Sequence, residues 1–471
     1  MELTFLQVDQ ANSEVYSSYL PGHTITPTHN YSDTTTPTFS ASTPCGEHKP
    51  RYHQHIKSQS QQAPGFCNAI PTANMVKIEP FDVEQWMDKY ELTPGVLNIA
   101  ETCAASISID DLVKLSEDQN LPPPLSTSTK LTYGHIRGSP GLRERLAGLY
   151  SVRATSSLSA DNILITPGAI AANFLLLYTL VGPGDHVICV HPTYQQLYAV
   201  PQSLGAEVSL WKLRKEKKYI PDLEELKGMI KENTKMIIIN NPNNPTGATI
   251  PKSVLQGLVD IAREKDIIIL SDEVYRPLFH GISPVDAEFP PSLVSLGYEK
   301  TIVVGSMSKA YSLAGIRLGW IASRSEAIIS AIAEARDYTT ISVSQLDDQV
   351  ASYALHASVI HSLLSRNIKL AKTNIALLEA FVNEHSSFCS WVKPTGGTTA
   401  FIKFENGREP VDDVQFCIDV IEKTKVMFLP GSKCFGEEHK GFVRIGFVSE
   451  TEVLREALEK LGAYLKENFK S

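Results

Sequence analysis

Cysteine is scarce in this chain and is never grouped as a set of ligands. The seven cysteines are scattered and odd in number, and no Cys-x-x-Cys pair or Cys/His cluster has the spacing of a metal site. A reducing compartment is the simplest interpretation of this usage. We therefore expect a cytoplasmic protein with no metal site.

Long apolar runs and an excess of positive charge are also missing. No run approaches the length of a membrane span, and MELTFLQVDQANSEVYSSY at the N-terminus has acids but no basic region, so we expect neither a membrane segment nor a targeting peptide. The net charge of −9 argues against nucleic acid or an anionic membrane as a partner.

Residues 1–74 have few aliphatic side chains and many Thr, Ser, Pro and His residues. Such a segment buries too little surface to offset its ordering entropy, so we predict a disordered tail. Its irregularly spaced histidines are expected to be solvated. Met75 starts a segment with folded character, and we expect 75–119 to be an N-terminal arm that joins a small domain.

From about residue 120, short β-rich apolar runs alternate with helical periodicity. The runs are 162–166, 186–190, 207–211, 236–240, 267–271 and 301–305. This alternation predicts an α/β fold whose large domain, 120–324, holds a mostly parallel sheet flanked by helices. A long helical stretch from Ser325 to about His385, followed by further strands and helices, predicts a smaller α/β domain over 325–471.

Two polar segments at strand ends have groups that suit a phosphate. NILITPGAIAANF turns through Gly168 into a helix near Ala169, whose free N–H groups and dipole favour an anion. SMSKAYSLAGIRLGW follows the run TIVVG and offers the hydroxyls of Ser306 and Ser308 and the guanidinium of Arg317. Taken alone, the glycine turn before the helix near Ala169 is also a common connection between a strand and a helix in α/β proteins.

Two further segments follow apolar runs at the same expected edge, where open α/β sheets bind ligands. NNPNNPTG is a rigid turn, and an amide such as Asn244 can donate to a ligand oxygen. SDEVYRP places Asp272 at the end of a run and Tyr275 three residues later. A buried carboxylate needs partners. Asp272 is thus either a satisfied structural residue or the partner of a protonated ring nitrogen.

Lys309 is the lone lysine in a small and apolar segment. Most such lysines pack their stem and extend the ammonium to water. The alternative is an amine held in a pocket to form a Schiff base, because burial lowers a lysine pKa and frees the nucleophile. A phosphate site, an amide, a carboxylate with a tyrosine and a lysine together match the functional groups of pyridoxal phosphate (PLP).

NPNNPTG, SDEVY and SMSKAYSLAGIRLGW, in this order and spacing, resemble fold type I, aspartate aminotransferase-like PLP enzymes of the class I/II aminotransferase family. The resemblance runs from about Phe81 to the C-terminus. It implies an amino-acid aminotransferase that uses amino-acid and 2-oxo-acid substrates and forms a homodimer with shared active sites. It also implies that Lys309 holds PLP as an internal aldimine. Lys309 would then move the proton at the substrate Cα in a reaction that passes through a quinonoid carbanion.

The resemblance assigns roles to the aromatic, acidic and amide residues. Asp272 would pair with the pyridine nitrogen, preserving the ring as an electron sink. Asn244 and Tyr275 would bond the phenolic oxygen, with Asn244 also near the substrate. Tyr194 would stack on the ring, and Tyr133 would reach the phosphate of the neighbouring subunit.

The remaining assignments concern the two anionic ends of the ligands. Phosphate contacts would come from Ser306, Ser308, Arg317 and the backbone of Gly168, Ala169 and Ile170. Arg444, in VRIGFV, matches the arginine that clamps the substrate α-carboxylate. Taken alone, Arg444 would be interpreted as an exposed surface arginine.

Three departures from the family pattern leave the reaction open. Ile170 stands where the family often has a polar residue, and Thr398 and Thr399 stand where many members have an aromatic. Ala100 and Glu101 resemble the motif of 1-aminocyclopropane-1-carboxylate synthases. YGHIRGSPGLR and GGTTAF also resemble capreomycidine synthases.

We therefore expect an aminotransferase, with a PLP-dependent lyase or cyclase of specialised metabolism as the alternative. That alternative covers a C–S lyase and enzymes like the two synthases just named. A catalytically idle PLP-fold protein is a third class. Glu101 is either an acid/base or substrate-amine contact, or a capped surface acid.

Overall fold

The structure is a computed structural model that describes residues 77–152, 154 and 156–470. The predicted disordered tail, 1–74, lies outside the described residues. No described helix is long and apolar enough to cross a membrane.

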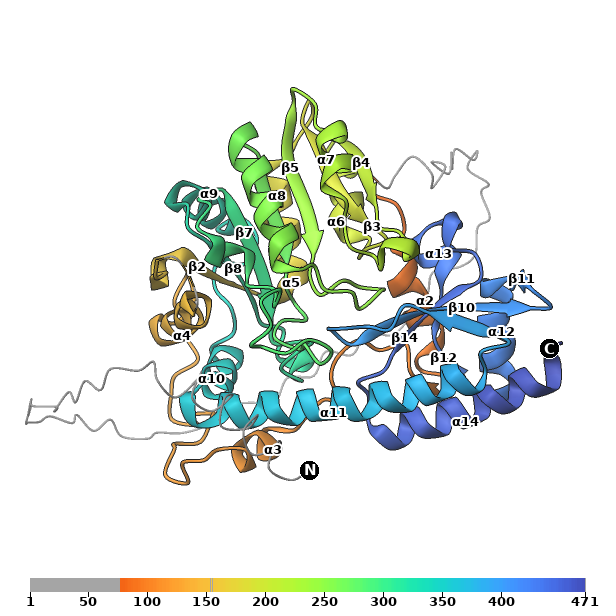
Figure 1. Cartoon of the computed structure of the whole chain (residues 1–471). Helices are drawn as coiled ribbons and strands as arrows, with labels where there is room; N and C mark the ends of the chain where they lie inside the picture. The colour runs from red at the N-terminus through yellow and green to blue at the C-terminus, as the bar shows by residue number, and fades with distance from the viewer. Residues whose placement is uncertain (1–76, 153, 155, 471) are drawn as a thin grey trace, which may run out of the picture. The chain divides into compact units, whose positions relative to one another are not determined.

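The larger sheet has seven strands in the order β2-β8-β7-β6-β5-β3-β4 (Figure 1). Neighbours pair in parallel, except that β8 is antiparallel to both β2 and β7. Six strands match the apolar runs predicted from the sequence, and β8 is an addition. Their bounds are β2 Ile163–Thr166, β3 His186–His191, β4 Glu207–Lys212, β5 Thr234–Asn240, β6 Ile268–Asp272, β7 Thr301–Ser306 and β8 Gly319–Ser323.

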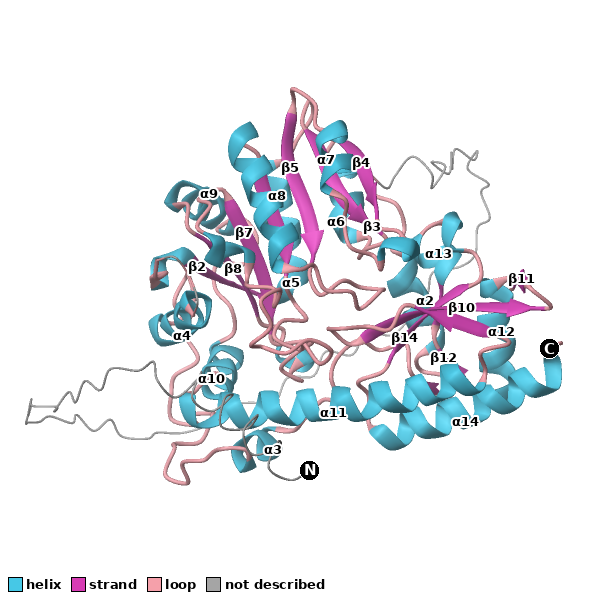
Figure 2. Cartoon of the chain, in the orientation of Figure 1, coloured by secondary structure: helices cyan, strands magenta, loops and turns pink. Residues whose placement is uncertain are grey.

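Helices cover both faces of this sheet (Figure 2). Alternate residues of β5 show why: Met236 and Ile238 belong to one apolar cluster, Ile237 and Ile239 to another. Helices α5, α6 and α9 contribute to the first cluster, and α4 and α8 to the second. The helices here are α4 Pro140–Ser151, α5 Gly168–Leu180, α6 Gln196–Ser203, α7 Leu223–Met229, α8 Lys252–Lys265 and α9 Glu326–Arg336.

A smaller antiparallel sheet follows, in the order β11-β10-β14-β13 with β9 also paired to β10. Helices α11, Ala357–Glu384, and α14 pack against each other beside it (Figure 1). The strands are β9 Cys389–Trp391, β10 Thr399–Asn406, β11 Glu409–Pro410, β13 Leu429–Pro430 and β14 Phe442–Gly446. The helices are α12 Asp413–Thr424, α13 Gly431–Phe435 and α14 Thr451–Asn468.

The helical stretch expected from Ser325 is three helices rather than one. After α9 come α10, Gln345–Ala354, and α11, Ala357–Glu384. Ser344 and His356 cap the new helices, because each side chain accepts a hydrogen bond from the first turn. A side-chain cap of this kind depends on a single residue. The helical periodicity of the whole stretch therefore does not reveal where a new helix begins.

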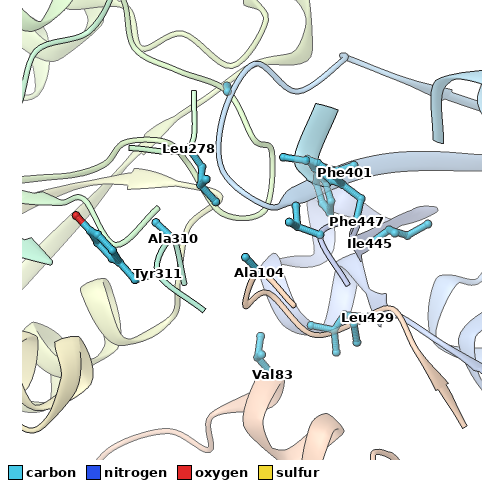
Figure 3. Packing of buried hydrophobic residues seen from close by; sticks show 14 of the residues in the cluster. Val83, Ala104, Leu278, Ala310, Tyr311, Phe401, Leu429, Ile445 and Phe447 are labelled. Atoms are coloured by element: carbon cyan, nitrogen blue, oxygen red, sulfur yellow. The ribbon is translucent and has the colours of Figure 1, made fainter. Parts of the chain in front are cut away.

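The N-terminal segment packs against the smaller sheet and against the loop after β7 that contains Lys309, which we call the lysine loop. Strand β1, Leu97–Asn98, pairs in parallel with β12, Val426–Met427, while α2, Asp82–Tyr90, and α3, Ile109–Lys114, flank it. Figure 3 shows Ala104 among Ala310 of the lysine loop and Phe447 of the smaller part, all in one buried cluster. This packing brings residues near 100 to the carboxyl edge of the larger sheet.

Candidate active site

The carboxyl ends of β5, β6 and β7 hold the residues singled out in the sequence. Asp272 is the last residue of β6, Asn244 lies in the turn after β5, and Lys309 follows β7. Gly168 begins α5 directly after β2. The predicted grouping of a phosphate site, an amide, a carboxylate and a lysine thus falls at one edge of the sheet.

Asp272 is an almost fully buried carboxylate held by neutral donors. It is 3% exposed and accepts hydrogen bonds from Asn173 Nδ2 at 3.0 Å and from the Val274 N–H at 3.2 Å. Burial raises the pKa of Asp272 to about 6, despite these bonds and the charge of Lys309. No salt bridge neutralises Asp272 in the described part of the chain, so the site favours a cation beside it.

Hydrogen bonds connect the turn after β5, which contains Asn244, to Asp272 and to Arg444. Asn240 Oδ1 accepts from the Asn244 N–H at 2.7 Å, and Asn240 Nδ2 donates to the Asp272 carbonyl at 3.1 Å. Asn244 Oδ1 in turn accepts from Arg444 Nη1 at 3.3 Å. The asparagine-rich turn is therefore a framework that fixes Asn244 between Asp272 and Arg444.

Arg444 lies in β14 and is 3% exposed, so it is not the surface arginine that was the alternative interpretation. Its Nη2 donates to the Ala100 carbonyl at 2.8 Å, while its buried Nε has no hydrogen-bond partner among the described residues. Burial lowers the pKa of Arg444. A buried guanidinium with a spare donor and no carboxylate partner in the described chain suits an anionic ligand group.

Lys309 makes three close contacts with one segment of the chain. Its Nζ donates to Thr102 Oγ1 at 2.7 Å and to Cys103 Sγ at 3.5 Å, and lies 3.5 Å from Glu101 Oε1. Burial lowers the pKa of Lys309, but Cys103 and Glu101 outweigh burial and raise it overall. The expectation that burial would lower this pKa is therefore wrong for the free amine, because an anion lies beside it.

Glu101 is an anion directed at the lysine. Its Oε1 accepts from the N–H groups of Thr102 at 2.5 Å and Cys103 at 2.9 Å. Burial raises the pKa of Glu101, but the Lys309 charge and these hydrogen bonds together lower it to about 2. Its side chain remains 45% exposed, which leaves the carboxylate within reach of a ligand.

The groups expected to bind phosphate meet at the start of α5. Gly168 has φ +82°, and a Cβ there would lie 2.7 Å from Arg317 Nη2. Arg317 Nη1 donates to Ser308 Oγ at 3.3 Å, which accepts from Ser306 Oγ at 2.9 Å. Ala169 and Ile170 follow in the first turn of the helix, where their N–H groups lack helical partners.

The three tyrosines differ in their surroundings. Tyr275 is buried, which raises its pKa. Tyr194 Oη donates to Glu84 Oε1 at 3.2 Å. Tyr133 is 80% exposed in the described chain.

Asn173 and Thr102 contact predicted residues, and sequence reasoning missed both. Asn173, 1% exposed, is the buried polar residue of the otherwise apolar helix α5, and that contrast was its available signal. Thr102, 6% exposed, gave no signal beyond its position next to Glu101.

One group of described residues has the composition of a metal site. His191, Glu438 and His439 each bring a ligand atom within 4.8 Å of the others. However, Lys212 Nζ lies 3.3 Å from His191 Nδ1 and forms an ion pair with Glu438. The lysine ammonium already neutralises this group, so we assign no metal to it.

The arrangement fits PLP on structural grounds. A glycine cradle beside an arginine and two serines suits its phosphate, and a buried carboxylate that no described cation neutralises suits its ring nitrogen. A lysine lies at the same edge. Fold and site together define a PLP-dependent enzyme of the aminotransferase type.

Comparison with known proteins agrees. Residues 108–461 match the family model for aminotransferase class I and II. The aspartate aminotransferase of Thermotoga maritima is 32% identical over 341 residues, which cover 71% of this chain and 84% of that protein. A capreomycidine synthase of Streptomyces vinaceus is 28% identical over 352 residues, covering 74% and 86%.

A solved structure is similar over most of the described chain. The crystal structure of a PLP-dependent aminotransferase from Streptococcus suis matches with a TM-score of 0.75 and 38% identity, covering 84% of this chain and all of that one. This chain belongs to the class I and II aminotransferase family. It is a PLP-dependent aminotransferase with amino-acid and 2-oxo-acid substrates.

Proposed function

We propose that this aminotransferase works at the carboxyl edge of the larger sheet, with Lys309 as the residue that bonds PLP. The bound cofactor supplies an electron sink for the carbanion at the substrate Cα. The observation that carries the assignment is the buried Asp272 carboxylate, which no cation neutralises in the described chain. As an anion, Asp272 would hold a proton on the ring nitrogen and so maintain that sink.

The other residues orient the two ligands. Gly168, Ser306, Ser308 and Arg317, with the first N–H groups of α5, would bind the phosphate. This role is supported by the proximity of Arg317 to Gly168 and by the hydrogen bond from Arg317 to Ser308.

The ring and the substrate would meet a second set of residues. Tyr275 and Asn244 would bond the phenolic oxygen, and Tyr194 would cover the ring. Arg444 would clamp the substrate α-carboxylate, a role that its burial and its spare Nε donor support.

We further propose a homodimer in which Tyr133 completes the site of the other subunit. Ile170, Phe174 and Tyr178 form an exposed apolar stripe on α5, at the four-residue spacing of one helix face. Such a face on the helix that starts the phosphate site suits contact with a second copy.

We also propose that the chain divides into the domains predicted from the sequence, with boundaries at 119 and 324.

The buried, unpaired state of the described cysteines supports a reducing compartment, and we propose the cytoplasm. A lyase or cyclase remains the second candidate function. It is favoured by Glu101, an anion 3.5 Å from Lys309 Nζ that could move a proton at a substrate side chain, and by the similarity to a capreomycidine synthase.

A product assay on the purified protein separates the two. Amino acids are screened with and without a 2-oxo acid while glutamate, new oxo acid, ammonia and cyclic products are measured. Turnover that requires the 2-oxo acid is the result expected for transamination. Turnover without it, with ammonia or a cyclic product released, would replace transamination by the lyase or cyclase function.

A further inference from the structure

The segment from Ile99 to Ala105 is bonded to both sides of the site. The Ala104 N–H donates to the Lys309 carbonyl at 3.1 Å, and the Ala105 N–H donates to the Val448 carbonyl at 2.8 Å. Thr398 Oγ1 donates to the Thr102 carbonyl at 2.7 Å. The backbone of Thr102 is thereby fixed against the lysine loop and the smaller sheet at once.

The hydroxyl of Thr102 accepts a hydrogen bond from the amine of the lysine. Lys309 Nζ donates to Thr102 Oγ1 at 2.7 Å. A hydroxyl has one proton to donate and lone pairs to accept with. Thr102 Oγ1 therefore presents a lone pair to the amine.

These contacts match a lysine that is free of the cofactor. A free ammonium has three N–H donors; here it donates to Thr102 and Cys103 and forms an ion pair with Glu101. Once the nitrogen is bonded to a cofactor carbon, it retains one N–H at most. The full set of contacts is therefore available only to the released amine.

We propose that Thr102 is a positioning residue that holds the amine of Lys309 whenever a substrate displaces it from the cofactor. The proposal rests on the proposed role of Lys309. Held by a side chain with a fixed backbone, the amine keeps one location beside the reacting carbon instead of sampling several rotamers. Thr102 itself touches neither cofactor nor substrate in this role.

Three variants and an α-methyl amino acid test the proposal on the holoenzyme. The α-methyl compound displaces the lysine but has no Cα proton to lose, so its binding measures the stability of the released amine. Thr102→Val keeps the shape of the side chain and removes the hydroxyl. Thr102→Ser restores the hydroxyl. Thr301→Val is the matched control, because Thr301, at the start of β7, is fully buried and its Oγ1 has no hydrogen-bond partner among the described residues.

We expect the dissociation constant of the α-methyl amino acid, followed by cofactor absorbance, to rise about 10- to 100-fold in Thr102→Val, the range for one hydrogen bond to a charged group. Thr102→Ser should restore it and Thr301→Val should leave it unchanged. With natural substrates, kcat should fall more than KM rises. Binding by Thr102→Val equal to that of the parent, or no recovery in Thr102→Ser, would overturn the proposal.

The same absorbance titration on Lys309→Ala separates this failure from a failure of the proposed function. If the Lys309→Ala protein still shows the parent's cofactor absorbance, Lys309 is not the residue that bonds PLP. If that absorbance is lost while Thr102→Val behaves as the parent, only the role of Thr102 is wrong.

Discussion

Asn173 donates a hydrogen bond of 3.0 Å from its Nδ2 to Asp272 Oδ2, while the buried Oδ1 of the same amide has no partner among the described residues. The amide can therefore turn over and accept instead of donate. This freedom makes Asp272→Asn a clean replacement, because a flipped Asn173 would accept from the new amide.

Asp272→Asn should stabilise the protein without cofactor and disable it with cofactor. Between pH 4 and 6 the folded chain keeps a proton on Asp272 that the unfolded chain has lost, so the free energy of unfolding falls as pH rises. The difference between the ordinary pKa of 3.8 and about 6 corresponds to about 3 kcal/mol at pH 7. Denaturant unfolding should show Asp272→Asn more stable by up to that amount at pH 7 and equal to the parent below pH 4. A cofactor-free parent as stable as the variant at pH 7 would contradict the buried, unneutralised carboxylate.

Arg444→Ala should weaken the use of every amino acid with a free α-carboxylate. Losing one partner of a buried ion pair costs about 2–5 kcal/mol, or about 30- to 5000-fold in kcat/KM, mostly through KM. The matched control is Arg455→Ala, because the Arg455 side chain, in α14, is half-exposed. An unchanged KM in the Arg444 variant would locate the carboxylate contact elsewhere.

Gly168→Ala should loosen the cofactor at its phosphate. The new Cβ would lie 2.7 Å from Arg317 Nη2 on a backbone at φ +82°, so the guanidinium must move. We expect the PLP dissociation constant to rise about 10- to 100-fold, as overpacking costs of 1–3 kcal/mol imply. Gly148→Ala, where the added Cβ would meet no described atom within 4 Å beyond its chain neighbours and its own helix backbone, should bind PLP as the parent does. Equal affinity in both variants would argue against the phosphate site.

Phe174→Glu should separate the subunits, because it puts a charge in the exposed stripe on α5. Sedimentation would then show a monomer with reduced activity. Mixing Lys309→Ala and Tyr133→Phe subunits tests the shared site. Hybrids should regain activity, because the intact lysine of one subunit meets the intact tyrosine of the other. A Phe174→Glu dimer, or mixed subunits without recovery, would count against this assembly.

The strands and their polar ends were predictable because local patterns encode them. Apolar runs of five residues mark β5, β6 and β7, and Asp272 and Lys309 follow from motifs next to those runs. The partners of these residues were not predictable in the same way. Thr102 is 207 residues from Lys309, and the packing of the N-terminal segment brings them together.

Strand β8 and the helix breaks were missed for a related reason. GWIAS is short and antiparallel, and its pairing with β2 and β7 depends on neighbours far along the chain. The raised pKa of Lys309 was also outside the reach of composition, since it depends on Glu101 lying 3.5 Å away.

The bond between Lys309 and PLP is tested most directly by reducing the holoenzyme with borohydride, digesting it and locating the cofactor by mass spectrometry. The cofactor mass should be found on the peptide that contains Lys309, and Lys309→Ala should retain none. Cofactor found on another lysine, or parent-level labelling in the variant, would contradict the assignment.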